Sequence, residues 1–321
     1  MLKKLCTLVL ITAFAFTFAG CSEEEFSDGG YYLNTMVSVT ARGENARQAV
    51  EAVLAETERI ENLLSAYKPE SEIYKINSAS IGESVEISEE TASLLKKALE
   101  FSRKTDGAFD ITVKPLVDLW NINSENPSVP KAEEIEQAVR AVGYENVILE
   151  GNAVRFLKEG MKIDLGGAAK GYCADRAAEI LESYGIRNAL MDFGGNIYAL
   201  GTNKNGAPWR IGLQDPGKSR GEYFRIEELS GKTAVTSGSY ERYFESDGKI
   251  YHHILNPQSG YPADSGLISA TVVGENSFEA DMLSTAVFVM GTENFGKIRS
   301  RFDFDRVITV DKSNQEHILS K

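Results

Sequence analysis

The segment from Lys162 to Asp175, Lys-Ile-Asp-Leu-Gly-Gly-Ala-Ala-Lys-Gly-Tyr-Cys-Ala-Asp, has the composition of an anion-binding turn. Its pattern predicts a strand that ends at Asp164, a tight turn at the glycine pair and a helix that begins at once. The first N–H groups of a helix are unpaired donors at the positive end of its dipole, so such a turn favours phosphate. Lys170, in the first helical turn, can reach the same anion. A plain strand-to-helix connection with a buried aspartate and a surface lysine explains this segment equally well.

A second candidate site pairs a carboxylate with a hydroxyl. In the stretch Glu-Ala-Asp-Met-Leu-Ser-Thr-Ala, Asp281 and Thr285 are four residues apart and lie on one face of the predicted helix. Both are hard oxygen ligands of the kind that suits Mg²⁺, which often needs only one or two carboxylates plus substrate phosphate. Ser284 is close enough to assist. The alternative is that Asp281 caps the helix and Thr285 packs in the core.

Histidines are few, and two of the three are adjacent. His252 and His253 precede Ile-Leu-Asn-Pro, and in a strand they point to opposite faces, so at most one faces a given site. Cysteine or further histidine ligands are lacking nearby, which argues against zinc. A turn of small residues, Thr-Ser-Gly-Ser, begins at Thr236 and offers N–H and hydroxyl donors to a phosphate, although ordinary surface turns have the same composition.

Two further segments carry polar or aromatic groups next to a turn. Asp110, in Asp-Gly-Ala-Phe-Asp-Ile-Thr-Val, is expected to enter a strand, where its carboxylate could accept a hydrogen bond from a heterocycle or simply cap the turn. Tyr67, in Ser-Ala-Tyr-Lys-Pro-Glu-Ser-Glu, offers an aromatic face. Each segment is a weak signal when taken alone.

Helices and strands alternate along the chain without a regular βαβ period. Helical spacing covers 45–64, the stretch between Ser88 and Gly107, 130–143, 167–185 and 279–290, with a further short helix before the last strand. Strand patterns cover 31–41, a hairpin at 147–157, most of 189–273, and 306–310. This order predicts an α+β fold (irregular α/β), with a single large domain, a mixed and mostly antiparallel sheet and flanking helices.

The first twenty residues have the pattern of a secretory signal. Lys3 and Lys4 precede an apolar run from Leu5 to Phe18, which is too short and wrongly flanked to span a membrane. Ala-Gly-Cys follows and resembles the bacterial lipobox, which implies a diacylated Cys21 and lasting attachment to a membrane. An ordinary secretory signal with a fortuitous cysteine is the alternative.

These features predict a signal peptide over 1–20, a lipid-anchored flexible tether over 21–30 and a folded domain over 31–321, exported and facing the periplasm or cell exterior. The whole chain has 34 basic and 47 acidic residues and a net charge of −13. Clustered basic residues are lacking, so nucleic acid is excluded as a partner. Apart from Cys21 the exported chain keeps only Cys173, which is expected to be a small core residue.

Taken together, the segments form an ordered array that resembles the bacterial FAD:protein FMN transferases, which are exported and often lipoproteins. The resemblance runs from about Tyr32 to Val310. The array, in order, is Ser-x-Tyr-x-x-x-Ser-Glu, Asp-Gly-x-Phe-Asp-Ile-Thr-Val-x-Pro-Leu-Val, Ile-Asp-Leu-Gly-Gly-x-Ala-Lys-Gly-Tyr, Gly-Gly-Asn-Ile, Thr-Ser-Gly-x-Tyr-Glu-Arg, His-Ile-Leu-x-Pro-x-x-Gly and Ala-Asp-x-Leu-Ser-Thr-Ala.

The resemblance implies binding of FAD with Mg²⁺ and transfer of its FMN half to a threonine or serine hydroxyl of an acceptor protein, with release of AMP. It implies that His253 is a base, and that Mg²⁺ is held by Asp281, Thr285 and the main-chain oxygen of Gly167. The contacts to FAD that it implies come from Leu33, Tyr67, Lys68, Pro69, Ala108, Phe109, Asp110, Asp164, Lys170 and Leu255.

One departure concerns the first of these contacts. The family's usual Met-Gly-Thr near the first strand is Leu33-Asn34-Thr35 here, so Asn34 replaces a flexible glycine. Two other functions use the same site: an FAD pyrophosphatase that yields FMN and AMP, and a lipoprotein that binds flavin without chemistry. The acceptor is expected to be a membrane-associated or exported redox protein.

Overall fold

The computed structural model describes residues 24–219 and 221–321. The helices are α1 (Ala46–Leu64), α2 (Glu72–Ser78), α3 (Glu89–Lys104), α4 (Lys114–Trp120), α5 (Ala132–Arg140), α6 (Ala169–Ser183) and α7 (Ser277–Ile298), with short 3-10 turns at Ile111–Val113, Tyr144–Asn146 and Arg299–Arg301. The strands are β1 (Glu25–Tyr32), β2 (Thr35–Arg42), β3 (Val85–Glu86), β4 (Val147–Glu150), β5 (Ala153–Phe156), β6 (Asn188–Phe193), β7 (Asn196–Leu200), β8 (Trp209–Gln214), β9 (Tyr223–Leu229), β10 (Lys232–Gly238), β11 (Tyr243–Ser246), β12 (Lys249–His252), β13 (Leu267–Gly274), β14 (Arg306–Asp311) and β15 (Glu316–Ser320).

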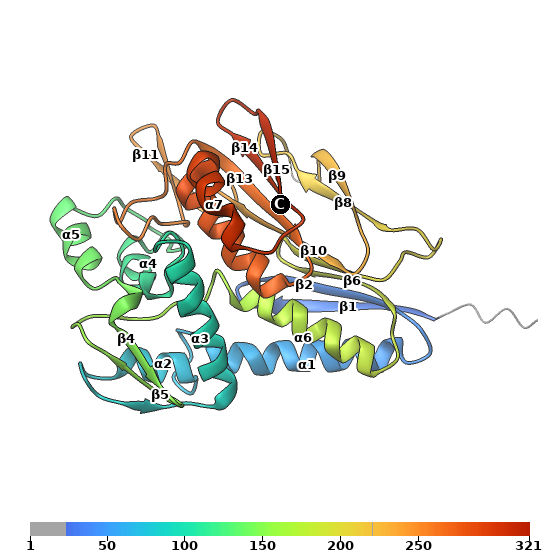
Figure 1. The fold of residues 1–321 in the computed structure, drawn as a ribbon, viewed down its shortest axis with the longest axis horizontal. Coiled ribbons are helices and arrows are strands. Elements are labelled where there is room, and N and C mark those ends of the chain that lie inside the picture. The colour runs from blue at the N-terminus through green and yellow to red at the C-terminus, as the bar shows by residue number, and fades with distance from the viewer. Residues whose placement is uncertain (1–23, 220) are drawn as a thin grey trace, which may run out of the picture.

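One large sheet carries the fold. Its eight strands lie in the order β1-β2-β6-β7-β10-β13-β14-β15, and every strand pair in the described part of the chain is antiparallel. Helices α1, α6 and α7 pack against one face of this sheet (Figure 1). The opposite face is covered by the β8–β9 hairpin, through Ile211, Leu213 and Leu229. The single domain with a mostly antiparallel sheet is therefore confirmed.

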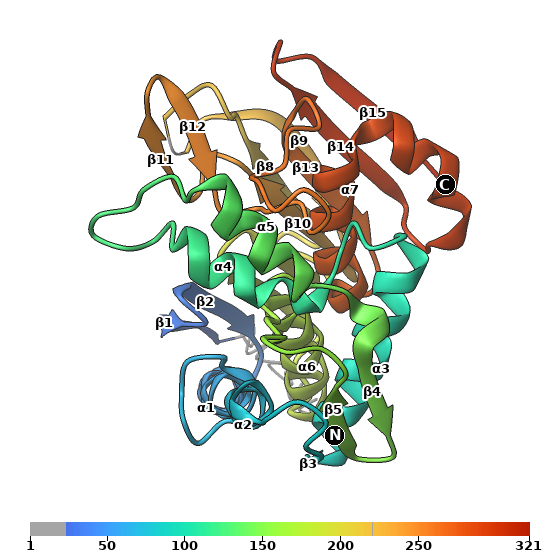
Figure 2. The same cartoon turned by 90° about the vertical axis from the view of Figure 1, so that its left-hand side faces the viewer.

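The remaining helices form a second layer beside the sheet. The three-stranded sheet β3-β5-β4 lies with α2 and α3 at one end, while α4 and α5 lie between the β1–β2 hairpin and the β11–β12 hairpin (Figure 2). Trp120 of α4 fixes this arrangement, because its ring stacks on Tyr251 at 5.5 Å and its indole N–H donates to the Gly260 carbonyl at 2.7 Å.

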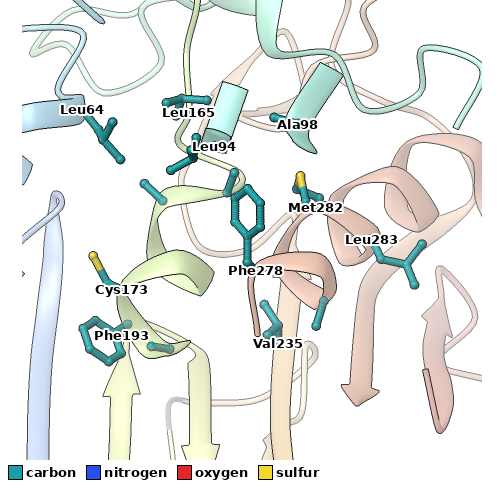
Figure 3. Packing of buried hydrophobic residues seen from close by; sticks show 14 of the residues in the cluster. Leu64, Leu94, Ala98, Leu165, Cys173, Phe193, Val235, Phe278, Met282 and Leu283 are labelled. Carbon is teal, nitrogen blue, oxygen red and sulfur yellow. The ribbon is translucent and has the colours of Figure 1, made fainter. Parts of the chain in front are cut away.

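The main hydrophobic core fills the space between α6, α7 and the sheet. Phe278 of α7 is 4% exposed and lies between the two helices, as Figure 3 shows. Cys173 of α6 is buried in the same core, and burial raises the pKa of its thiol well above the usual range, so the expected core role is confirmed.

Four local expectations were wrong. The strand expected over 31–41 is a hairpin with a turn at Leu33-Asn34. Residues 25–30 lie in β1, so the flexible tether expected over 21–30 does not extend past Glu24. The residues before Asp164 form no strand, although its N–H donates to the Ile111 carbonyl at 2.8 Å. Asp110 enters a 3-10 turn and α4 rather than a strand, because its carboxylate caps that turn.

Candidate active site

The closest approach of α6 and α7 is made possible by a glycine. A Cβ on Gly171 would lie 2.3 Å from the Ser277 carbonyl oxygen, which no side chain tolerates. The two helices are also tied in both directions. Gly171 N–H donates to Asp281 of α7 at 2.9 Å, and Asp175 of α6 accepts from the N–H groups of Ser277 and Phe278 at 2.8 and 2.9 Å. We call this arrangement the helix crossing.

The helix crossing brings the three expected metal ligands into one neighbourhood. The Cβ position of Gly167 lies 3.2 Å from the Thr285 hydroxyl oxygen, so the main chain just before α6 runs against α7. Asp281 is only 2% exposed, and one of its carboxylate oxygens lies 3.5 Å from the ammonium of Lys170. Lys170 also donates to the Gly166 carbonyl at 3.0 Å. Gly167 therefore lies against Thr285, one helical turn from Asp281, and Lys170 lies beside the Asp281 carboxylate.

The alternative role for Asp281 as a helix cap is wrong. Asn276 is the N-cap of α7, where its side chain accepts from the Glu279 N–H at 2.8 Å. Thr285 and Ser284 are joined to a small hydroxyl network through Ser237, whose Oγ lies 2.8 Å from Ser284 Oγ and 3.3 Å from Thr285 Oγ1. The Thr-Ser-Gly segment, which was expected to form a turn, is instead the end of β10, and its Ser237 lies beside the two α7 hydroxyls.

A cavity of about 740 Å³ opens beside the helix crossing. Its size falls in the range typical of small-molecule sites. Tyr31, Glu61, Asp118 and Arg242 are among its lining residues. The expected site residues that line it are Leu33, Tyr67, Lys68, Asp164, Lys170, His253 and Leu255.

The other expected residues lie outside this lining. Ala108, Phe109 and Asp110 lie behind the glycine turn, with Phe109 Cε2 only 3.3 Å from the Gly167 Cβ position. Asp110 accepts from the Thr112 N–H and hydroxyl at 2.8 and 2.7 Å and from the Tyr144 N–H at 3.1 Å. Burial raises its pKa, while Thr112 acts in the opposite direction.

Pro69, Gly167, Asp281 and Thr285 are likewise not among the lining residues. Pro69 directly follows Lys68, which does line the cavity. Among the described residues no group of three His, Cys, Asp or Glu side chains could hold a metal ion. The expected ligand set has one carboxylate only, so it needs substrate oxygens to complete the coordination.

The β1–β2 turn forms part of the cavity mouth. Leu33 and Asn34 have φ angles of +51° and +58°, which is the two-residue hairpin turn that asparagine accepts readily and leucine does not. Two side chains hold this turn: Glu61 accepts from the Leu33 N–H at 3.1 Å, and Arg242 donates to the Asn34 carbonyl at 2.7 Å. The departure from the family's glycine is thus accommodated without losing the turn.

His252 and His253 point in different directions, as expected, although β12 ends at His252. The His252 ring packs edge-on against Phe288, and its Nε2 lies 3.1 Å from the Ala263 carbonyl. His253 lines the cavity, and its Nδ1 lies 3.3 Å from the Arg242 carbonyl. Burial, followed by the charge of Arg242, lowers the pKa of His253 to about 3, so its imidazole is neutral near pH 7. A carbonyl only accepts, so Nδ1 carries the proton and Nε2 is the free acceptor.

Asp164 is a further residue that lines the cavity. Its carboxylate accepts from the Gly166 N–H at 2.7 Å, which shapes the glycine turn. Burial raises its pKa, and the Gly166 hydrogen bond offsets part of that rise. Tyr67 is 59% exposed, with the Lys114 ammonium 4.4 Å from its ring centroid, so one aromatic face is presented at the mouth.

Arg242 is the main site residue that sequence reasoning left without a role. It lies in the Thr-Ser-Gly-x-Tyr-Glu-Arg motif, and a basic residue that closes a motif begun by small donors was the available signal. Glu61 and Asp118 had no comparable signal, because acidic residues on helices are ordinarily solvated. Only the tertiary arrangement brings α1 and α4 to one cavity.

Solved structures share this architecture. The ApbE protein of Thermotoga maritima MSB8 is 38% identical, with a TM-score of 0.84 and coverage of 92% of this chain and 96% of that one. The flavin transferase ApbE from Vibrio cholerae is 28% identical, with a TM-score of 0.83 and coverage of 93% and 97%. These likenesses define the class of fold as the one found in ApbE structures.

Sequence relatives agree with the structures. A relative from Klebsiella pneumoniae (strain 342) named FAD:protein FMN transferase is 38% identical over 265 residues, which are 82% of this chain and 81% of the relative. One of the same name from Escherichia coli (strain K12) is 30% identical over 314 residues, covering 92% and 90%. Residues 33–304 match the model of the ApbE family. The chain belongs to the ApbE family.

The expected signal peptide and the lipidated Cys21 lie outside the described residues. Within the part of the chain that the structure describes, no helix is both long and apolar enough to cross a membrane.

Proposed function

We propose that this protein transfers the FMN half of FAD onto a threonine or serine hydroxyl of an acceptor protein and releases AMP. The observation that carries the proposal is a cavity lined by a neutral histidine and a lysine, with the buried carboxylate of Asp281 3.5 Å from that lysine, in a member of the ApbE family. Relatives that cover most of the chain are named for this activity.

The cavity suits FAD in size and in chemistry. A volume of about 740 Å³ accommodates much of a dinucleotide, and the lining combines apolar and aromatic side chains with cations. Leu33, Leu255 and Tyr67 offer apolar surface to the flavin ring, while Lys68 and Lys170 offer charge to the diphosphate. Pro69 and residues 108–110 do not line the cavity, and they support the residues that do.

The helix crossing fits Mg²⁺. Asp281, the Thr285 hydroxyl and the Gly167 carbonyl are hard oxygen donors, and a Cβ at position 167 would crowd the Thr285 hydroxyl at 3.2 Å. When bound, Mg²⁺ neutralises charge on the diphosphate and makes AMP a better leaving group. Lys170, 3.5 Å from Asp281, is placed to contribute to the same neutralisation.

The chemical step is a displacement at the phosphorus of the FMN half. The acceptor hydroxyl oxygen forms a bond to that phosphorus, the bridging P–O bond breaks, and its electron pair leaves with AMP. The hydroxyl proton passes to a base, for which His253 Nε2 is the candidate, since Nδ1 is held by the Arg242 carbonyl. An imidazole with a pKa of about 3 is a weak base, but an incoming diphosphate dianion raises that pKa through its negative charge.

Anchoring of the enzyme is part of the proposal. The sequence pattern ending at Cys21 supports a lipidated, exported enzyme, so the acceptor would be a membrane-associated or exported redox protein. Replacement of Cys21 by serine should release the enzyme into the soluble exported fraction. A Cys21→Ser protein that stays with membranes after a salt wash would contradict the lipid anchor.

Incubation of the purified chain with FAD, Mg²⁺ and a candidate acceptor, followed by intact mass measurement and nucleotide analysis, tests the function. We expect the acceptor to gain the mass of FMN less water, with one AMP released per acceptor. AMP with free FMN and no labelled acceptor would indicate an FAD pyrophosphatase. Binding of FAD without AMP release would indicate a flavin carrier.

A further inference from the structure

Arg242 holds an unusual position among the charged residues of the cavity. It follows β10 in a short turn before β11, is half-buried and lines the cavity together with Lys170 and His253. Its guanidinium donates to the Asn34 carbonyl at 2.7 Å. A guanidinium has five N–H donors in a fixed planar fork, so this single bond leaves most of its donors for another acceptor.

No carboxylate neutralises this guanidinium. Among the residues that the structure describes, no Asp or Glu oxygen lies within 4.0 Å of it. The same holds for some exposed arginines such as Arg210, but Arg242 is the described arginine that lines the cavity. A guanidinium that lines a cavity without an acidic partner is available to an anionic ligand in that cavity. A planar fork of donors at such a place matches the oxygens of a phosphoryl group, which an arginine binds in a bidentate manner.

The main chain of Arg242 is tied to the candidate base. Its carbonyl accepts from the His253 N–H at 3.1 Å and faces His253 Nδ1 at 3.3 Å. The main chain of Arg242 therefore holds the imidazole at the cavity wall, and both side chains line the same cavity, so an acceptor hydroxyl that loses its proton to His253 enters the cavity that Arg242 lines. The phosphorus under attack lies within bonding distance of that hydroxyl in the transition state.

We propose that Arg242 is a further catalytic residue, whose guanidinium binds the non-bridging oxygens of the FMN phosphoryl group while the acceptor hydroxyl attacks it. The inference rests on the proposed function and adds a positive charge beside the candidate base. Charge on the transferred group spreads over its equatorial oxygens in the transition state, so a bidentate cation there contributes to the rate more than to ground-state binding.

The competing role for Arg242 is purely structural: its side chain holds the β1–β2 turn. A lysine at position 242 distinguishes the catalytic role from the structural one. Arg242→Lys keeps a charge and a donor for the Asn34 carbonyl but loses the planar fork, so a structural role predicts near-normal turnover. Arg242→Ala loses the charge and all the side-chain donors, but it leaves space in which an added guanidinium ion can bind.

The test compares wild type, Arg242→Lys and Arg242→Ala, with the exposed Arg210→Ala on β8 as control. We expect kcat to fall roughly 10²–10³-fold in Arg242→Ala and at least about tenfold in Arg242→Lys, while FAD affinity falls about tenfold or less. Guanidinium chloride at low millimolar concentration should restore part of the Arg242→Ala rate with saturation, and NaCl at equal ionic strength should not. Thermal melting of each variant shows that the fold persists.

Arg242→Lys at the wild-type rate, or Arg242→Ala whose rate loss only follows a lowered melting temperature, would overturn the inference. A wild-type chain that neither labels an acceptor nor releases AMP would instead contradict the proposed function. In that case binding of inorganic pyrophosphate with Mg²⁺ decides the inference, because Arg242→Ala should weaken that binding about tenfold while Arg210→Ala should not. Equal binding by both variants would refute it.

Discussion

The helix crossing and the cavity mouth both belong to the candidate site, but they are built differently. At the crossing, Asp281 is 2% exposed and α6 and α7 are joined by reciprocal hydrogen bonds around a glycine that no other residue can replace. At the mouth, the Leu33-Asn34 turn has positive φ angles and is held from each side by one side-chain hydrogen bond. The crossing is fixed by the core, whereas the mouth is held by replaceable contacts.

This difference suits the two jobs of a protein-modifying transferase. Under the proposed function, the diphosphate and Mg²⁺ would be the same in every reaction cycle, so a rigid, buried arrangement serves them best. Under the same proposal the acceptor is a protein whose hydroxyl must enter and leave, so the mouth would have to admit a polypeptide. Leu33, with a φ angle of +51°, places strained backbone at the cavity mouth. Strained backbone of this kind is typical of functional sites.

The largest expected effect is at the crossing. Asp281→Ala removes the only anionic ligand that we assign to Mg²⁺, and we expect turnover to fall at least about 10³-fold, because the metal supplies several kcal/mol of charge stabilisation. The Gly171 N–H also loses its acceptor, which should cost about 1–3 kcal/mol of stability. Single-turnover assays over a range of Mg²⁺ concentrations and thermal melting measure both.

Glu279→Ala is the matched control for Asp281, since it removes an exposed carboxylate from the same helix. Normal turnover of Asp281→Ala at limiting Mg²⁺ would remove Asp281 from the metal site.

The second largest expected effect is the loss of the His253 side chain. His253→Ala should lower turnover by roughly 10²–10⁴-fold, the usual range for a lost acid–base group, with little change in FAD affinity. His252→Ala is the control, because that ring packs against Phe288 and not in the cavity; it should lose stability but keep its rate. Single-turnover rates and FAD dissociation constants separate the two. Poor FAD binding with normal turnover at saturation in His253→Ala would refute the base assignment.

A smaller effect tests whether the crossing is as rigid as its contacts indicate. Gly171→Ala places a Cβ against the Ser277 carbonyl and forces α6 and α7 apart, so we expect a loss of about 1–3 kcal/mol of stability and a weaker response to Mg²⁺. Gly296→Ala in α7 is the control, since its Cβ meets nothing within 4 Å. Chemical denaturation and Mg²⁺-dependent shifts in melting temperature measure the two effects. Equal stability of both variants would show that the helices can separate freely.

The same contrast explains what the sequence could and could not predict. The α7 pair Asp281 and Thr285 could be predicted because a helix has one fixed period. The glycine turn before α6 could be predicted because its residue types permit few structures. The turn at Leu33-Asn34 was missed, since leucine at a positive φ angle contradicts local preference and persists only through Glu61 and Arg242. Tertiary contacts of this kind leave no local pattern.

The smallest expected effect is the pH dependence of stability, in which the two regions oppose each other. Burial lowers the pKa of His253 to about 3, so its contribution to stability is present above the unfolded pKa of about 6.5 and is lost as the pH falls. Burial raises the pKa of Asp175 to about 6, so its contribution is present below about pH 4 and is lost as the pH rises through 6. We therefore expect His253→Gln to reduce the loss of melting temperature between pH 7 and pH 4.5, and Asp175→Asn to increase it, by about a few degrees each. Unchanged pH profiles in both variants would show that neither group is desolvated as its burial indicates.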